Sequence, residues 1–583
     1  MKKFFAILAI VASGLAGYVI TKKQASKANQ TAYKLEAKQS ALYWPEGLVW
    51  LCTDLLEVSY RDEINHFSIE TANGKDSFRE LSKIIFKFGD LLLTQSVLIA
   101  GQRGRQESVR CLLSAATFYR AAQTLANKTS YYSNVWVNNK LKTVEMLLLS
   151  LYNNLDGFNA QEWESILNSR LKKLDNIRQF SEAELTKIEN KYKFSNRNLL
   201  FLRAYEVQKL SKKISAELRE FYVEVIQSCK NSLGHSKEKC SIIGFGSLAH
   251  QTATPYSDLE YGILIEAGDS KRYFRNLASL VELQLIFLGE TVIPISYFGQ
   301  SFHHLLPGGV SADLGGKTPL NRKWNNAFAS LHPYLKQGDK YDLIASPEVM
   351  AGYLDNTFLK VDKKLPLVML HSVLLEGDTR IYRNFKKSRH RFLSHKAPNQ
   401  EKYYRSKALE LILADRNYLK INPNKNVYDV KLEVLRPIEC LIDDLALYYG
   451  INKQTVWEEL WEMGRPSLIS PMRTRIISER LALDLFIALG IAVELRLKSD
   501  LINKSQYYKL RINSSENQGS PNHLEKRFFS EQDKELLEIF FNTLQIFCED
   551  LPNHLYNESL KCIRESDKDH LQSLRLSRRS RWV

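Results

Sequence analysis

The chain has 583 residues, 44% of them hydrophobic and 25% charged, and its formal net charge is +16. This length excludes a single hydrophobic core and predicts three or four domains of ordinary globular composition. The seven cysteines are odd in number, scattered and without a C-x-x-C pair, which argues against a disulfide framework and favours a reducing compartment. No grouping of histidine and cysteine has the spacing of a zinc site, and the adjacent His303 and His304 are interpreted as structural.

The N-terminus predicts a signal anchor or signal peptide over residues 1–23. An uncharged, mostly apolar run extends from Phe4 to Ile20 and has two lysines on each side. The run is at the short limit of the roughly 17–25 residues that span a bilayer, and its small residues also fit a cleavable signal peptide. Because the two flanks carry similar charge, the positive-inside rule does not fix an orientation.

Residues 30–232 are predicted to form a helical domain. Apolar residues recur at helical spacing along two segments: Leu48, Leu51, Cys52, Leu55 and Val58, and Leu171, Leu174 and Ile177. No fixed repeat period is visible, so a solenoid is not predicted. The domain is either a scaffold that binds a partner or a helical bundle without one.

Residues 240–266 combine a glycine–serine turn with a pair of acids. One apolar run leads to Gly246 and Ser247, and a second apolar run begins around Asp258 and Glu260. Side chains alternate across a strand, so the two acids point to one face, roughly 6–7 Å apart along it. A face that carries two carboxylates can hold a divalent metal ion.

This pattern resembles the signature of the nucleotidyltransferase superfamily, an apolar strand, Gly-Ser, a short gap and then Asp-x-Asp/Glu on the next strand. The resemblance implies a small mixed-sheet module, which we place at residues 233–350. It also implies that the Gly246 amide and the Ser247 hydroxyl bind the phosphates of an NTP, and that Asp258 and Glu260 bind Mg²⁺ or Mn²⁺. Taken singly, such a turn and such an acid pair are more often a plain loop and a solvated strand edge.

The resemblance is incomplete at the next predicted strand. A helix-period segment from Phe274 to Leu285 is followed by Thr291 to Phe298, a strand that Pro294 pushes toward a sheet edge. Many members of the superfamily carry a third carboxylate there, whereas this strand has none. The next acid is Asp313, a candidate third catalytic acid, and Lys317 follows two glycines and could contact phosphate. A plain glycine-rich loop is the alternative for this segment.

Residues 351–570 are predicted to form a second helical domain. The segments around Tyr428 and Asp443 resemble the helical region that follows this module in bacterial relatives of the PII-signal-protein uridylyltransferase. Apolar residues recur at helical spacing in two stripes that we assign to the core: Ile438, Leu441, Ile442 and Leu445, and Leu481, Leu485, Ala488, Ala492 and Leu495.

Two basic clusters contribute to the positive charge, residues 380–396 and the tail 571–583. Neither lies in a recognised nucleic-acid-binding motif, and runs of charge are usually solvated faces. Attraction to an anionic membrane is the most economical interpretation for an anchored protein. Alternatively, the first cluster folds toward Gly246 and neutralises a triphosphate.

The sequence thus predicts an α+β protein that is mostly α, with a small mixed-sheet module between two helical domains and an N-terminal membrane segment. The resemblance implies a magnesium-dependent nucleotidyltransferase that moves a nucleoside monophosphate from an NTP to an acceptor hydroxyl, on a protein by analogy with the uridylyltransferase. The missing third acid motivates an alternative, a catalytically lapsed regulator that binds nucleotide or a partner at a membrane. An RNA-modifying nucleotidyltransferase ranks third. The use of NTP and the free cysteines favour a single-pass anchor with the body facing the cytoplasm, and export is the alternative.

Overall fold

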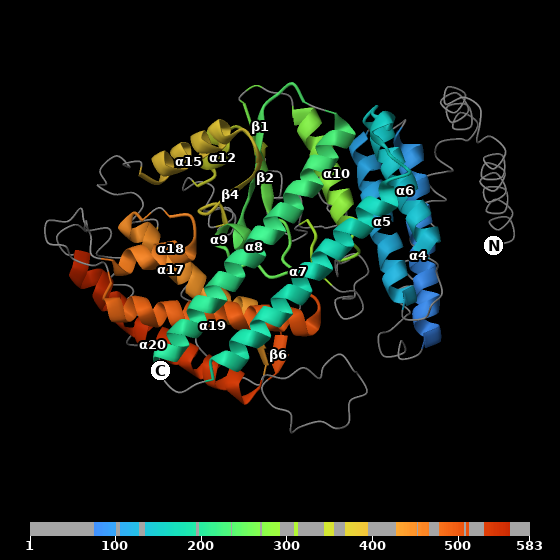
Figure 1. Ribbon diagram of the computed structural model, residues 1–583. Coiled ribbons are helices and arrows are strands. Elements are labelled where there is room, and N and C mark those ends of the chain that lie inside the picture. Colours follow the sequence, from blue (N-terminus) through green and yellow to red (C-terminus); the bar gives the residue numbers. More distant parts are fainter. Residues whose placement is uncertain are drawn as a thin grey trace, which may run out of the picture. The chain divides into compact units, whose positions relative to one another are not determined.

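The computed structural model describes residues 75–100, 105–127, 134–193, 197–234, 236–266, 268, 271–291, 308–312, 343–354, 368–394, 408, 427–451, 453–465, 477–506, 509–511 and 530–559 (Figure 1). All of them belong to one compact unit, Tyr60–Val583. Within these ranges, no helix is both long and apolar enough to cross a bilayer. The predicted membrane segment at residues 1–23, the stripe from Leu48 to Val58 and the basic tail 571–583 lie outside the described residues.

The described part of the predicted N-terminal domain is helical, as expected. It consists of α4 (Lys75–Ala100), α5 (Arg105–Asn127), α6 (Asn134–Leu151), a short turn of helix η1 (Leu155–Gly157), α7 (Trp163–Lys191) and α8 (Arg197–Leu233). Helices α4, α5 and α6 lie side by side (Figure 1). The alanine-rich α5 brings its aromatic side chains against α4: the rings of Phe118 and Phe88 are 4.8 Å apart, and the Tyr119 hydroxyl donates to Asp90 at 2.7 Å. Aromatic side chains of α5 thus join it to α4.

The sheet has four strands in the order β3-β2-β1-β4. Its strands are β1 (Cys240–Gly244), β2 (Tyr261–Ile265), β3 (Ile344–Ala345) and β4 (Val373–Gly377). Strand β1 is antiparallel to β2 and β4, and β2 is parallel to β3, so the sheet is mixed, as predicted. Strand β4 follows residue 350 in sequence, so the sheet includes chain from the region where we expected the C-terminal helical domain. The predicted strand from Thr291 to Phe298 lies outside the described residues, except for Thr291 itself.

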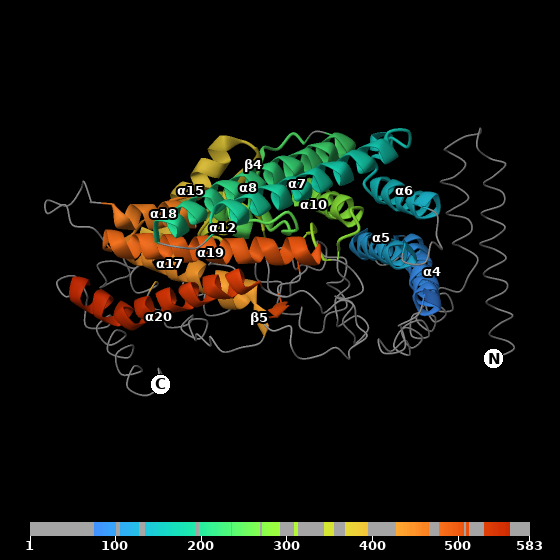
Figure 2. The ribbon, with the colours of Figure 1, turned by 60° about the horizontal axis from the view of Figure 1, so that its bottom comes forward.

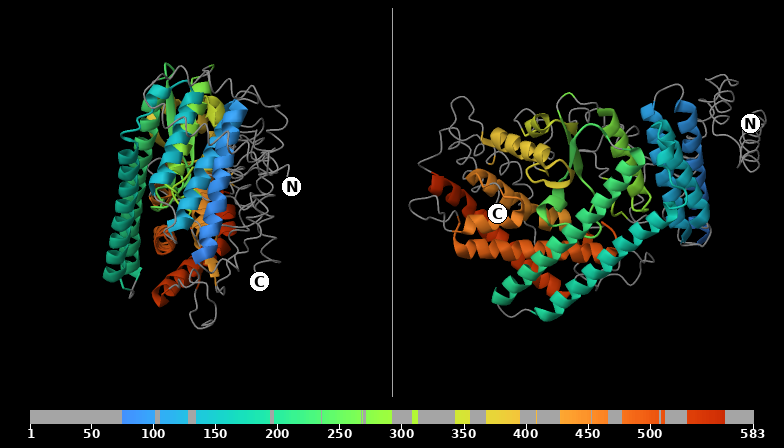
Figure 3. Two further views of the ribbon diagram at one scale, coloured as in Figure 1. Left: turned by 90° about the vertical axis from the view of Figure 1, so that its right-hand side faces the viewer. Right: turned by 45° about the horizontal axis from the view of Figure 1, so that its top comes forward.

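Helices cover both faces of the sheet, which explains why β1 and β2 are apolar without alternation. On one face, Ile243 and Leu264 pack in a buried cluster with Met350 of α12 (Pro347–Gly352) and Phe385 of α15 (Thr379–Ser394). On the other side lie α8 and α10 (Lys271–Ile286), as Figure 3 shows in its right-hand view. The helix-period residues predicted between 274 and 285 are buried on α10, which confirms their assignment to the core.

The C-terminal region is mostly helical, as predicted. It comprises the strand pair β5 (Val427–Asp429) and β6 (Lys509–Arg511), a short π-helix η4 (Val430–Leu435), α17 (Arg436–Tyr449), α18 (Val456–Gly464), α19 (Glu479–Asn503) and α20 (Glu531–Ser559). The predicted stripe on α17 is at most 2% exposed. On α19 the stripe is buried from Leu485 onward, whereas Leu481 is half-buried. Both stripes therefore contribute to the core.

Helix α19 lies between α8 and α20 (Figure 2). Gly490 makes the approach to α8 possible, because a Cβ there would come within 2.4 Å of the Ala204 Cβ. One turn later, Glu494 accepts hydrogen bonds from the Arg203 guanidinium, with Nε to Oε2 at 2.8 Å, and both side chains are at most 2% exposed. The two helical regions on either side of the sheet module in sequence are thus joined through α8 and α19.

The predicted basic cluster at 380–396 maps mainly to α15, and its members differ in role. Arg383, Lys387 and Arg391 are exposed. Arg389 is buried and donates to the Leu370 carbonyl, and burial lowers the pKa of its guanidinium. Arg389 is therefore a structural residue rather than part of a basic surface.

Candidate functional site

The turn after β1 has the close backbone approach that the glycine–serine pair predicts. Gly246 has φ of +56°, in the left-handed region that favours glycine, and starts the short helix α9 (Gly246–His250). A Cβ at Gly246 would lie 2.2 Å from Oε2 of Glu260. The absence of a side chain thus lets the turn pack directly against one of the two predicted metal-binding acids.

The two acids immediately precede β2. The antiparallel pairing with β1 extends to them, because the Phe245 amide donates to the Glu260 carbonyl at 2.9 Å. Between the acids, Leu259 is 1% exposed and pairs in parallel with Ala312, and its amide donates to the Ser311 carbonyl at 2.8 Å. Since Leu259 points into the core, the alternation of an extended chain turns Asp258 and Glu260 to the other side.

The side chains of the predicted site are more exposed to solvent than the residues around them. From Cys240 to Ile265, every residue is buried except Gly246, Ser247, Gln251, Asp258 and Glu260, which are half-buried. All four residues that the sequence assigned to phosphate and metal binding in this stretch are among the five. The strand pair therefore keeps its apolar residues in the core and leaves the turn and the acids partly accessible, with Oε2 of Glu260 itself buried.

This geometry can be compared with known families. Residues 197–294 match the family described as "Putative nucleotidyltransferase DUF294". The match spans α8, β1, α9, β2 and α10, so it includes both the turn and the acid pair. No curated protein is similar enough to match the chain. The similarity supports a nucleotidyltransferase-like module around the sheet.

The loop between the turn and the acids is held by the two neighbouring helices. From α8, the Tyr222 hydroxyl donates to the Ser257 carbonyl at 2.7 Å. From α19, Arg496 donates to the Thr252 carbonyl and to the Ser257 hydroxyl, both at 3.2 Å. Because Tyr222 and Arg496 are at most 2% exposed, these contacts fix the position of the acids from inside the core.

Asp500 of α19 is a buried acid behind this loop, and the sequence analysis did not identify it. It is fully buried and accepts a hydrogen bond from the Thr254 hydroxyl at 2.5 Å. Burial and, to a smaller extent, the charge of Asp258 raise the pKa of its carboxyl to about 6, against the opposing effects of Arg496 and the Thr254 hydrogen bond. Asp500 therefore responds electrostatically to the charge at the acid pair.

Gln506, just after α19, is a second residue that sequence reasoning missed. Its side-chain amide donates to the Tyr256 carbonyl at 2.6 Å and to Asp258 Oδ1 at 3.2 Å. Its backbone amide donates to the Gly308 carbonyl at 2.8 Å. Gln506 thus orients the Asp258 carboxylate and ties it to the segment at 308–312, and no local motif could have indicated this contact across the chain.

Two other predicted site residues, Asp313 and Lys317, lie outside the described residues. The nearest described residue is Ala312, which precedes Asp313 and pairs with Leu259 between the two acids. The predicted roles of Asp313 as a third acid and of Lys317 as a phosphate contact therefore stay predictions.

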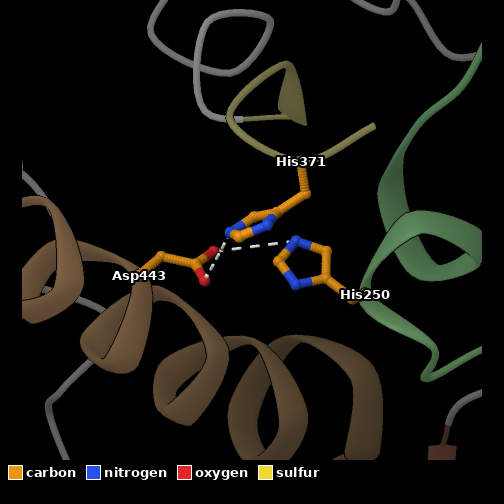
Figure 4. A group of neighbouring side chains, drawn as sticks. All are labelled: His250, His371 and Asp443. Carbon is orange, nitrogen blue, oxygen red and sulfur yellow. Dashed lines mark hydrogen bonds and ion pairs between the residues drawn. The ribbon is translucent and has the colours of Figure 1, made fainter. Parts of the chain in front are cut away.

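At its other end, α9 enters a cluster of histidines and acids. His250, His371 before β4 and Asp443 of α17 offer ligand atoms that all lie within 4.8 Å of one another (Figure 4). Their positions are 121 and 72 residues apart in sequence (371 − 250 and 443 − 371), so no local spacing could have revealed them. The sequence shows no histidines at the spacing of a zinc site. Such spacing covers neighbours along the chain only, so it could not indicate a cluster that the fold assembles from distant segments.

Proposed function

We propose that the protein is a metal-dependent nucleotidyltransferase that moves a nucleoside monophosphate from an NTP to an acceptor hydroxyl. The proposal rests chiefly on the packing of Gly246 against the Glu260 carboxylate on a strand pair that is otherwise buried. A phosphate-binding turn must lie beside its metal-binding acids for this chemistry. The match of residues 197–294 to a nucleotidyltransferase family supports the same conclusion.

The roles of the residues follow from their chemistry. The half-buried turn at Gly246 and Ser247 offers backbone amides and a hydroxyl to the phosphates. Asp258 and Glu260 offer oxygen ligands, which suit Mg²⁺ or Mn²⁺. When bound there, the metal ion would neutralise charge on the phosphates. The Gln506 amide orients the Asp258 carboxylate, and Leu259 in the core holds both acids on the accessible side.

The reaction that this arrangement would support is an in-line displacement at the α-phosphorus. The acceptor oxygen forms a bond to this phosphorus while the bond to the leaving pyrophosphate breaks, and the hydroxyl proton passes to solvent. Asp313 is the proposed third acid, because its neighbour Ala312 pairs with Leu259. Lys317 is proposed to contact phosphate.

The proposal also includes an acceptor and a cellular location for the protein. A protein hydroxyl is the proposed acceptor, by analogy with the PII-signal-protein uridylyltransferase. The proposed location is a membrane, anchored by residues 1–23 with the body in the cytoplasm. The exposed Arg383, Lys387 and Arg391 of α15 are proposed to interact with anionic lipids.

The test measures nucleotide transfer by the full-length protein. Purified protein is incubated with labelled ATP, UTP, CTP or GTP and Mg²⁺, and both pyrophosphate release and labelling of protein are followed. We expect turnover by the wild type and its loss in Asp258→Asn and Glu260→Gln. Glu266→Gln is the matched control, because Glu266 lies exposed at the other end of β2.

Each outcome distinguishes the proposal from its alternatives. Equal turnover in all three variants would contradict the assignment of the site. Nucleotide binding without turnover would favour the catalytically lapsed regulator. That alternative is based on the absence of an acid from the segment Thr291 to Phe298. Labelling of added RNA, with affinity that falls steeply with salt, would favour the RNA-modifying alternative.

A further inference from the structure

The cluster at the end of α9 brings together nitrogen and oxygen ligands in the core. His250, His371 and Asp443 are 8%, 3% and 9% exposed. Nε2 of His371 lies 3.2 Å from Oδ1 of Asp443, and Nε2 of His250 lies 3.6 Å from Oδ2 of the same carboxylate. Figure 4 shows both rings directed at Asp443, with the three side chains coming from separate segments of the chain.

The hydrogen bonding of His371 indicates that a cation belongs between it and Asp443. Nδ1 of His371 lies 3.2 Å from the Gln454 carbonyl, so this nitrogen carries a proton and donates it. In a neutral imidazole, the lone pair of Nε2 then faces a carboxylate oxygen. Two acceptors at this distance repel each other unless a proton or a metal ion lies between them. A metal-binding histidine commonly donates its other ring nitrogen to a carbonyl, as His371 does here.

Glu459 of α18 adds a second carboxylate to the cluster. Its Oε1 lies 3.5 Å from Nε2 of His371, and the residue is 4% exposed. Its other oxygen, Oε2, is buried and receives no hydrogen bond from an N–H or hydroxyl donor among the residues that the structure describes, and the carboxyl groups of Glu459 and Asp443 are in hydrogen-bond contact with each other. Ligands at about 2.0–2.1 Å from a tetrahedral ion lie roughly 3.3 Å from each other. The nitrogen–oxygen separations of 3.2, 3.5 and 3.6 Å are near this value, with the two histidines facing different oxygens of Asp443. The ligand atoms of His250, His371 and Asp443 all lie within 4.8 Å of one another, so the side chains would draw together around an ion.

We propose that His250, His371, Asp443 and Glu459 form a buried site for one divalent transition-metal ion of the zinc class. Two imidazoles with carboxylates suit zinc, whereas Mg²⁺ and Ca²⁺ prefer oxygen ligands alone. The near-complete burial of four ligands is typical of a closed, structural site.

The ion would connect the phosphate-binding turn to the C-terminal helices. Helix α9 begins at Gly246 and ends at His250, whereas the acids come from α17 and α18. A metal ion at this position fixes the far end of α9 against these helices and so fixes the turn at its start. The ligands are separate from Asp258 and Glu260, so this inference does not depend on the proposed transferase activity.

The test measures tightly bound metal in the full-length protein. Protein treated with chelator is reconstituted with zinc, dialysed and assayed by mass spectrometry for metal content, and a second sample is loaded with Co²⁺ as a spectroscopic probe. We expect one equivalent of zinc per chain and the intense visible absorption of four-coordinate Co²⁺. Zinc should also raise the melting temperature of the chelator-treated protein.

Conservative variants distinguish a loss of zinc binding from a loss of folding. His371→Gln and Asp443→Asn should lose the bound zinc and the cobalt absorption, with circular dichroism confirming that each variant is folded. His390→Gln is the matched control, since His390 is exposed on α15, and the double variant Asp258→Asn/Glu260→Gln should also keep the ion. The proposal is wrong if the wild type retains no zinc, or if His371→Gln and Asp443→Asn retain as much as the control. The cluster would then be held by shared protons.

Discussion

Helix α9 joins two groups of acids that lie in opposite environments. At its start, Asp258 and Glu260 are half-buried beside Gly246, and the ligands they offer are oxygens. At its end, Asp443 and Glu459 are 9% and 4% exposed. Asp443 faces the imidazoles of His250 and His371, and Glu459 faces that of His371. A metal ion that arrives with a nucleotide needs an accessible site of oxygen ligands. A resident ion is better held where water and competing ligands cannot enter. The contrast in burial therefore separates the proposed reaction site from the proposed structural one.

Removing the accessible acids should produce the largest effect. Asp258→Asn or Glu260→Gln is expected to reduce nucleotidyl transfer by about 10³-fold or more, because metal stabilisation of the transition state is worth several kcal/mol. The initial rate of pyrophosphate release measures this loss. The melting temperature should change little, since both side chains are half-buried. Loss of activity together with unfolding would show instead that the acids support the fold.

The buried Asp500 offers a pH-dependent test of how burial affects an acid. Its pKa is raised by burial from 3.8 to about 6, so between these values the folded state binds a proton that the unfolded state has released. The wild type therefore loses stability as the pH rises through this range, by about 3 kcal/mol in total. Asp500→Asn removes this loss and should melt at a higher temperature than the wild type at pH 8.

The difference should shrink as the pH falls toward 3.8, where Asp500 is protonated in the folded state and becomes protonated in the unfolded state as well. Thermal unfolding followed by circular dichroism at several pH values measures it. Asp484→Asn on the same helix is the control, because Asp484 is partly exposed and pairs with Arg197 near the surface. A gain for Asp500→Asn that is equal at every pH would contradict the explanation.

Adding a methyl group at the turn should disturb the proposed reaction site by more than its backbone strain alone would. Gly246→Ala would place its Cβ 2.2 Å from the Glu260 carboxylate, so the end of this side chain must move. We expect transfer to fall by about 10²-fold, since displacing a reacting group by about 1 Å has effects of this order. Titration of Mg²⁺ dependence measures the accompanying loss of metal affinity.

Gly234→Ala is the control for backbone strain in this experiment. Gly234 has φ of +73°, and a Cβ there would meet nothing within 4 Å. Both substitutions carry the cost of a left-handed alanine, roughly 1–2 kcal/mol, but only the first touches Glu260. Equal losses of activity would mean that strain, and not contact with the acid, is responsible.

The smallest expected effect is a loss of stability on changing Thr252, in the loop after α9 that contacts α17. The Thr252 hydroxyl donates to Oε1 of Glu439 on α17 at 2.7 Å. Thr252→Val keeps the shape and removes the donor, so we expect a loss of about 1–2 kcal/mol in the free energy of unfolding. Thr186→Val is the control, because this exposed hydroxyl donates only within α7. Comparison of the melting temperatures checks the difference, and equal values would contradict the link.

The sequence determined the features that depend on short separations along the chain. The turn at Gly246 follows β1 and the acids at 258 and 260 precede β2, and these strands are antiparallel neighbours. The motif that grouped the turn with the acids therefore spans a short, locally paired stretch of chain. The stripe on α17 likewise predicted its burial, because helical periodicity alone places these residues on one face. For both features, local backbone geometry sufficed.

Only the tertiary structure decided which distant segments complete these regions. Strand β4 joins β1 across more than a hundred residues, Gln506 reaches Asp258 from beyond α19, and Arg389 turns inward from a run of basic residues. The cluster of His250, His371 and Asp443 assembles in the same way. Periodicity and motif spacing describe the neighbours of a residue along one element. Contacts between elements arise from how their buried faces pack together, which no local pattern records.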